Sequence, residues 1–69
     1  MPSEYACFRC EGQTRSGETV TLYCSTHGPQ RAIRMFLETC DAENLDIVAA
    51  SAFSQEGSAA LAKWGASPR

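Results

Sequence analysis

Two short cysteine motifs constrain the fold of this chain more than any other feature of its sequence. Cys7 and Cys10 form a C-x-x-C pair, and Cys24 forms a C-x-x-H pair with His27, the only histidine. A spacer of two residues lets both side chains of a pair reach one ion, and two such pairs supply the corners of a tetrahedron. A chain of 69 residues buries only a small core, so a bound metal would add stability that the core lacks. The spacing therefore predicts one structural Zn²⁺, bound by Cys7, Cys10, Cys24 and His27.

The segment between the two pairs is expected to form a β-hairpin that brings them together. Its second half is rich in β-branched and aromatic residues, and Ser16-Gly17 supply a two-residue turn. In the register that this turn sets, Arg9 faces Cys24 across the hairpin. Both cysteine pairs then reach the open end of the same hairpin, on strands about 4.8 Å apart.

Three further elements are expected after the hairpin. Gly28-Pro29 begins a helix whose apolar stripe is formed by Ile33, Phe36, Leu37 and Cys40, and Asn44 suits its left-handed end. The next segment fits a strand or a helix, and the strand is favoured because Ser54 can cap a new helix that ends at Gly65. We therefore expect a single α+β domain: a zinc-stabilised β-hairpin at 1–28, a helix at 29–44, a short strand at 45–53, a C-terminal helix at 54–65 and a flexible tail at 66–69.

The cysteines have alternative assignments. Cys40 can replace His27 as the fourth ligand, although its place on the helix stripe favours a buried apolar role. A redox C-x-x-C needs a helix that starts inside the motif, and residues 11–18 do not have that pattern. The first residues lack the basic start and apolar run of a secretory signal, and no segment has the length of a membrane span. We therefore expect a cytoplasmic protein whose cysteines stay reduced rather than paired in disulfides.

Over residues 7–37 the chain resembles the zinc-ribbon and treble-clef class of zinc fingers, with CFRC as the first knuckle and CSTH as the second. The helix start at Gly28-Pro29 is closer to a treble clef, which draws its second ligand pair from a helix N-terminus. The resemblance implies a closed, structural zinc site and names no specific family. The first knuckle departs from the usual pattern, because Phe8 and Arg9 stand where glycine or proline is common. Phe8 is expected to cover the metal, with partner contact as the alternative.

The residue pattern disfavours an enzyme. Once His27 binds metal the chain has no second imidazole, and Gly12, Gly17 and Gly28 sit singly, in what we take to be turns rather than a phosphate loop. The prediction is a regulatory module that binds another protein or a second copy of itself. Its candidate contact residues are Phe8, Arg9, Arg15, Arg31, Arg34 and Met35.

The sequence also allows alternative interpretations of Met35, of the arginines and of Cys40. Met35 lies outside the apolar stripe, so it is either a partner contact or covered by the C-terminal helix, whereas Phe53 and Trp64 are expected in the core. Nucleic-acid binding is the alternative function, and it would use Arg9, Arg15, Arg31 and Arg34. It is disfavoured because the net charge is −2 and DNA binders usually carry a basic excess. A thiol sensor that uses Cys40 is weaker, because a buried thiol reacts poorly.

Overall fold

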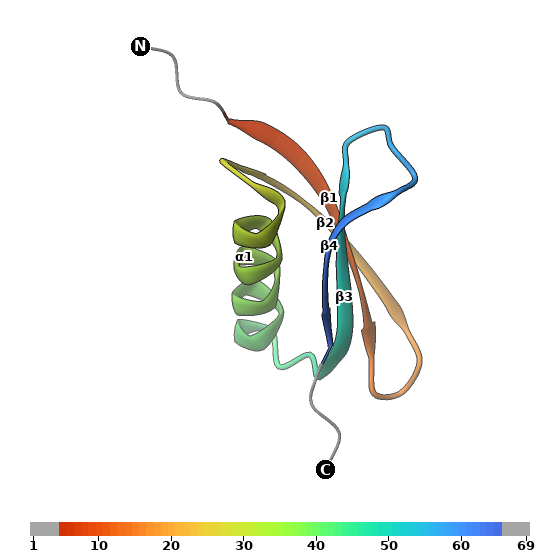
Figure 1. Cartoon of the computed structure of the whole chain (residues 1–69). Coiled ribbons are helices and arrows are strands. Elements are labelled where there is room, and N and C mark those ends of the chain that lie inside the picture. Colours follow the sequence, from red (N-terminus) through yellow and green to blue (C-terminus); the bar gives the residue numbers. More distant parts are fainter. Residues whose placement is uncertain (1–4, 66–69) are drawn as a thin grey trace.

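A four-stranded antiparallel sheet with one helix on one face forms the described part of the chain, residues 5–65 of a computed structural model (Figure 1). The elements follow in the order β1 (Ala6–Thr14), β2 (Thr19–Thr26), α1 (Pro29–Ala42), β3 (Ile47–Ser54) and β4 (Ala60–Gly65). The strand order is β2-β1-β3-β4, which makes β2 and β4 the edge strands. Since β2 and β3 both run antiparallel to β1, they are parallel to each other, and α1 is the crossover that such a pair requires. The fold is thus α+β, and in residues 5–65 no helix is long and apolar enough to cross a membrane.

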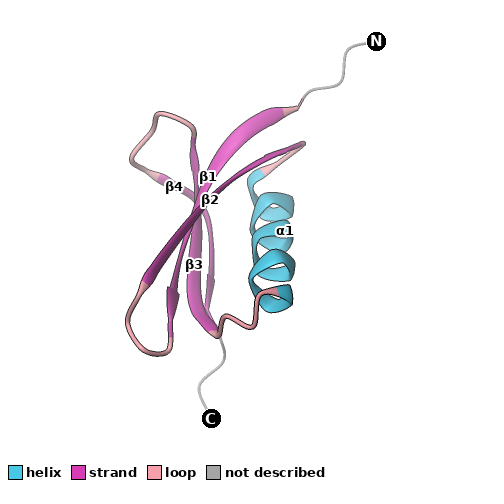
Figure 2. Ribbon diagram, turned by 180° about the vertical axis from the view of Figure 1, so that it is seen from behind, coloured by secondary structure: helices cyan, strands magenta, loops and turns pink. Residues whose placement is uncertain are grey.

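The core lies between α1 and the sheet. Side chains alternate along β1, so that Phe8 and Cys10 are buried beneath α1 while Arg9 and Glu11 point to the other face. In the part of the chain that is described, no element lies over this other face, which we call the uncovered face (Figure 2). The buried apolar residues are Phe8, Cys10, Ala32, Ile33, Phe36, Cys40, Ile47, Ala50 and Ala52.

The predicted start and stop of the first helix are confirmed. The helix starts at Pro29 after Gly28, and its last helical residue is Ala42. Asn44 takes a left-handed conformation with φ of 63°. The Leu45 N–H then donates to the Cys40 carbonyl at 2.9 Å, so that the chain folds back on the last helical turn.

The predicted two-residue hairpin turn is wrong, and the hairpin register changes with it. The loop comprises Arg15, Ser16 and Gly17, with Gly17 at φ of 97°, and the Thr14 N–H donates to the Glu18 carbonyl at 2.8 Å. This is the three-residue loop in which a left-handed glycine forms a bulge. The extra loop residue moves the register by one position.

The predicted C-terminal helix is also wrong, whereas the strand predicted before it is confirmed as β3. After β3 the chain turns, with the Gly57 N–H donating to the Ser54 carbonyl at 3.2 Å, and then forms β4 along β3. Gly57 lies where the first turn of the helix was expected, and glycine disfavours that conformation. Cross-strand pairing with β3 outweighs the helix propensity of the alanines.

Gly12 lies within β1 rather than in a turn, and it faces α1. A Cβ atom at this position would lie 2.6 Å from Cε2 of Phe36, whose side chain is fully buried. The missing side chain of Gly12 therefore leaves the space that the Phe36 ring fills.

Candidate functional site on the uncovered face of the sheet

The first predicted ligand pair lies inside a strand instead of on a turn. Cys7 and Cys10 both belong to β1 and are three residues apart, so their side chains leave opposite faces of the sheet. Cys10 is buried beneath α1, whereas Cys7 lies on the uncovered face opposite Ser25. The C-x-x-C pair therefore does not converge on one point.

The second predicted pair is also divided. Cys24 lies on the helix side of β2, opposite Phe8, and packs against the core. His27 lies beyond the end of β2, exposed, with its ring centroid 4.3 Å from that of Tyr5. Within residues 5–65, no three histidine, cysteine, aspartate or glutamate side chains gather in a way that could hold a metal ion. The four residues do not fit a tetrahedral zinc site in this geometry, and zinc binding stays a prediction from the sequence.

The layer between the sheet and α1 contains three of the four cysteines, namely Cys10, Cys24 and Cys40. Burial, followed by the neighbouring Cys24 thiol, raises the pKa of Cys10 to about 12. The pKa of Cys40 is raised as well, chiefly by burial and then by Cys24 and Glu43. At neutral pH the thiols of Cys10 and Cys40 are therefore protonated, which makes them poor nucleophiles. The expectation that Cys40 serves as a buried apolar side chain is confirmed.

The predicted partner contacts lie on separate parts of the molecule. Phe8 is buried in the core, so it offers no surface to a partner, and its predicted role as a cover for the metal stays a prediction. Arg15, in the hairpin loop, forms an ion pair with Asp46 at 2.6 Å. Three more of the predicted contacts lie on α1 and are exposed: Arg31, Arg34 and Met35.

Of the six predicted contacts, Arg9 alone lies on the uncovered face, at the centre of a row of three side chains. It faces Tyr23 of β2 on one side and Phe53 of β3 on the other. Its guanidinium carbon lies 4.5 Å from the centroid of the Phe53 ring. We call Tyr23, Arg9 and Phe53 the aromatic row.

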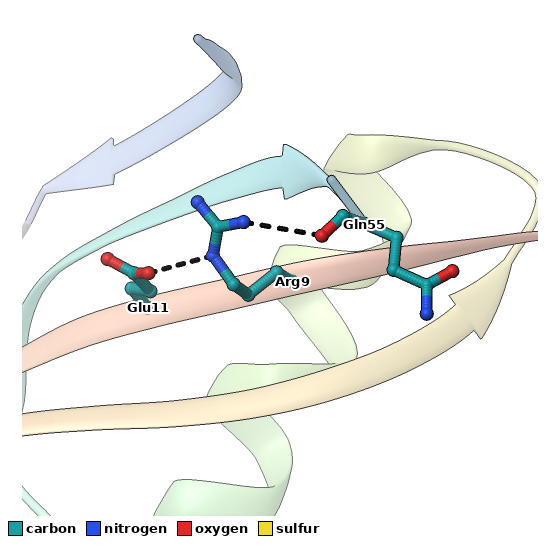
Figure 3. A network of polar contacts seen from close by, with 3 residues as sticks. All are labelled: Arg9, Glu11 and Gln55. Atoms are coloured by element: carbon teal, nitrogen blue, oxygen red, sulfur yellow. Dashed lines mark hydrogen bonds and ion pairs between the residues drawn. The ribbon is translucent and has the colours of Figure 1, made fainter. Parts of the chain in front are cut away.

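Polar contacts fix the position of Arg9 within this row (Figure 3). Its Nε donates to the Glu11 carboxylate at 2.8 Å, and its Nη1 donates to the Gln55 carbonyl at 3.4 Å. Glu11 lies two residues along the same strand, while Gln55 follows β3. The guanidinium is therefore held over the Phe53 ring before any partner binds.

The aromatic row is open to solvent and continues into an exposed apolar side chain on the next strand. Tyr23, within the row, is 60% exposed, and Leu61 of β4 is 52% exposed. The charges of the neighbouring strands nearly balance, because Glu11 offsets Arg9 and only Lys63 adds to it. The result is an open surface with aromatic and aliphatic contacts and a small net charge.

Tyr23, Phe53 and Leu61 were not predicted as surface contacts. Leu61 was missed because residues 54–65 were expected to form a helix, and Phe53 was expected in the core but lies on the uncovered face. In the expected helix, the alternation of Leu61 and Lys63 with alanines does not place these two residues on one face. That alternation, read as a strand, is the signal that would have placed Leu61 and Lys63 on one face. Trp64 was expected in the core, yet it lies on the helix side of β4 with 37% of its surface exposed.

Comparison of the chain with family models, with curated proteins and with solved structures finds no match.

Proposed function

We propose that the protein is a small, non-catalytic, regulatory module that binds another protein through the uncovered face of its sheet. The observation that carries this proposal is the aromatic row, in which Arg9 is stacked on Phe53 beside the exposed Tyr23. Tyrosine, phenylalanine and arginine are enriched at protein interfaces, and tyrosine and arginine are frequent among the residues that dominate binding energy.

The fixed position of Arg9 supports the same conclusion. A long, flexible side chain normally loses conformational freedom when it is buried by a partner. Arg9 is already restrained by Glu11 and Gln55, so part of this entropic cost is met in the free protein. A partner with an apolar or aromatic side chain could then pack on the row with little rearrangement.

The remaining chemistry supports a binding role over catalysis. The His27 ring packs against Tyr5 in a tilted arrangement, and Cys10 and Cys40 are buried thiols with raised pKa. The uncovered face carries one thiol, that of Cys7, whereas His27, the only histidine, lies beyond the end of β2, so the face offers mainly aromatic and aliphatic contacts.

Nucleic-acid binding, the alternative function, has weaker support. The four arginines do not form one patch, because Arg9 and Arg15 are engaged with Glu11 and Asp46 and the other two lie on α1. Affinity for nucleic acid comes largely from phosphate neutralisation, and this needs a concentrated positive charge. The near-balanced charge of the uncovered face is better suited to a protein surface.

A photo-crosslinking experiment tests the proposal. The photoreactive amino acid p-benzoyl-phenylalanine replaces Phe53 in one version of the full chain and Met35, on the helix, in a matched control. After irradiation in a lysate of the source cells, we expect the Phe53 probe to form a discrete adduct whose size nuclease treatment does not change. Unlabelled wild-type protein should compete with the adduct, while the Tyr23→Ala variant should compete more weakly.

Two results would contradict the proposal. An adduct found only with the Met35 probe would place the contact surface on α1. A nuclease-sensitive adduct at Phe53 would favour the nucleic-acid alternative, since aromatic side chains on an open sheet also stack with bases.

A further inference from the structure

The outer edge of β2 has the composition of a strand that pairs with another strand. β2 has eight residues, none of them charged and none of them proline. Within residues 5–65, β1 is its only partner, so its other edge is free. Proteins usually protect a free edge with charges, proline or a bulge, because an unprotected edge is a template for further pairing.

The hydrogen-bond pattern identifies the backbone groups that point outward. The Thr14 N–H donates to Glu18, so even-numbered residues of β2 bond to β1 and odd-numbered residues do not. The N–H and C=O groups of the odd-numbered residues are consequently directed away from β1. These residues are Thr19, Thr21, Tyr23 and Ser25.

The opposite edge of the sheet is better protected. β4 has six residues, it includes the charged Lys63, and its pairing with β3 is interrupted by a register shift between Ala52 and Phe53. A charge and a bulge are two of the devices that blunt an edge strand. The two edges of the sheet therefore differ, and β2 is the one suited to pairing.

We propose that the free edge of β2 pairs antiparallel with β2 of a second copy of this chain, forming a symmetric dimer with a continuous sheet. The sequence of β2 is complementary to itself in the register that centres on Leu22. Thr21 then faces the partner's Tyr23 across a hydrogen-bonded pair, and Val20 faces the partner's Cys24 on the helix side. No like charges meet, because the strand carries none.

The dimer would also cover a partly buried apolar side chain. Leu22 packs only partly against the core of its own chain, and in this register it meets Leu22 of the partner subunit on the helix side. A two-fold axis through this pair, perpendicular to the sheet, closes the assembly at two copies. It places both helices on one face and joins the two uncovered faces on the other, with the aromatic rows next to each other.

The proposal is independent of the proposed function, because self-pairing is measured on the purified chain without a partner. Sedimentation of the wild-type protein over a wide concentration range should show a reversible monomer–dimer equilibrium. Thr21→Pro removes an N–H that points outward, so it should weaken dimerisation by more than about tenfold and leave the monomer folded. Lys63→Pro makes the matched change at the other edge of the sheet and should leave the dimer intact.

Amide hydrogen exchange gives a second measurement that needs no variant. As the concentration of the wild-type protein rises, the N–H groups of Thr21 and Tyr23 should become protected, while those of Leu61 and Lys63 on β4 should not. A wild-type chain that stays monomeric at every concentration would overturn the proposal. A dimer that breaks with Lys63→Pro, or that protects β4 and not β2, would overturn it as well.

Discussion

At the scale of single residues, the contact between Gly12 and Phe36 sets the distance between β1 and α1. Phe36 is the largest fully buried side chain, and its ring occupies the space above Gly12. On the other side, a Cβ at position 12 would lie 3.2 Å from the carbonyl oxygen of Ala49 in β3. A ring and a backbone atom cannot both move away easily, so this position requires a glycine for reasons of space.

Gly12→Ala should destabilise the fold by about 1–3 kcal/mol, the usual cost of overpacking a core. Urea unfolding at equilibrium would measure this change. Gly65→Ala is the control, because a Cβ at that strand position meets no atom within 4 Å. If the clash with Phe36 is the cause, Phe36→Leu should reduce the cost of Gly12→Ala, and an unchanged cost in that background would contradict the explanation.

At the scale of elements, the sequence predicted correctly the features that depend only on residues close together in the chain. The helix from Pro29 and its end at Asn44 were predictable, because a proline at the start and a left-handed residue at the end act within a few residues. β4 was not predictable in the same way. Its alanines favour a helix in isolation, and it becomes a strand because β3 offers a free edge to pair with.

The buried thiols between the sheet and α1 should make the free energy of unfolding depend on pH in the alkaline range. Burial raises the pKa of Cys10 from 9.0 to about 12, so the unfolded chain releases this proton before the folded chain does. Above about pH 9 the unfolded state binds fewer protons, and the free energy of unfolding should fall as pH rises, by up to about 1.4 kcal/mol per pH unit. Urea unfolding between neutral pH and pH 10, under reducing conditions, would measure this slope.

Cys10→Ala should reduce that slope, because it removes one of the two buried thiols whose pKa is raised, while Cys40 keeps the other contribution. Cys7→Ala is the matched control, since it removes a thiol from the uncovered face of the same strand and should keep the slope. Equal slopes in wild type and Cys10→Ala would contradict the assignment of the effect to the layer beneath α1.

At the scale of the whole molecule, the length of the hairpin loop, which is one residue longer than predicted, decides which side chains of β1 and β2 lie on the same face. The C-x-x-C spacing predicts a metal site only if Cys7 and Cys10 lie on a turn, and no local signal excludes that. The sheet instead draws both into β1, because β1 pairs with β2 and β3 at once. The loop from Arg15 to Gly17 then shifts the hairpin register, which moves Cys24 to the side of Cys10 and away from Cys7. Ligand spacing could be read from the sequence, but the face on which each ligand lies could not.

Metal chelation separates the two accounts of what stabilises the chain. A zinc finger draws about 10–16 kcal/mol from its ion, so a chelator would unfold it. The core around Phe36 joins α1 to β1 without the four predicted ligands meeting, and we therefore expect a chelator to leave the thermal midpoint and the circular dichroism spectrum unchanged. Native mass spectrometry of the same samples would report whether zinc is bound. His27→Ala should likewise leave stability unchanged, because its ring contacts Tyr5 at the surface. Bound zinc together with unfolding on chelation would instead support the site predicted from the sequence, and would require Cys7 to turn toward Cys10 and break the pairing of β1.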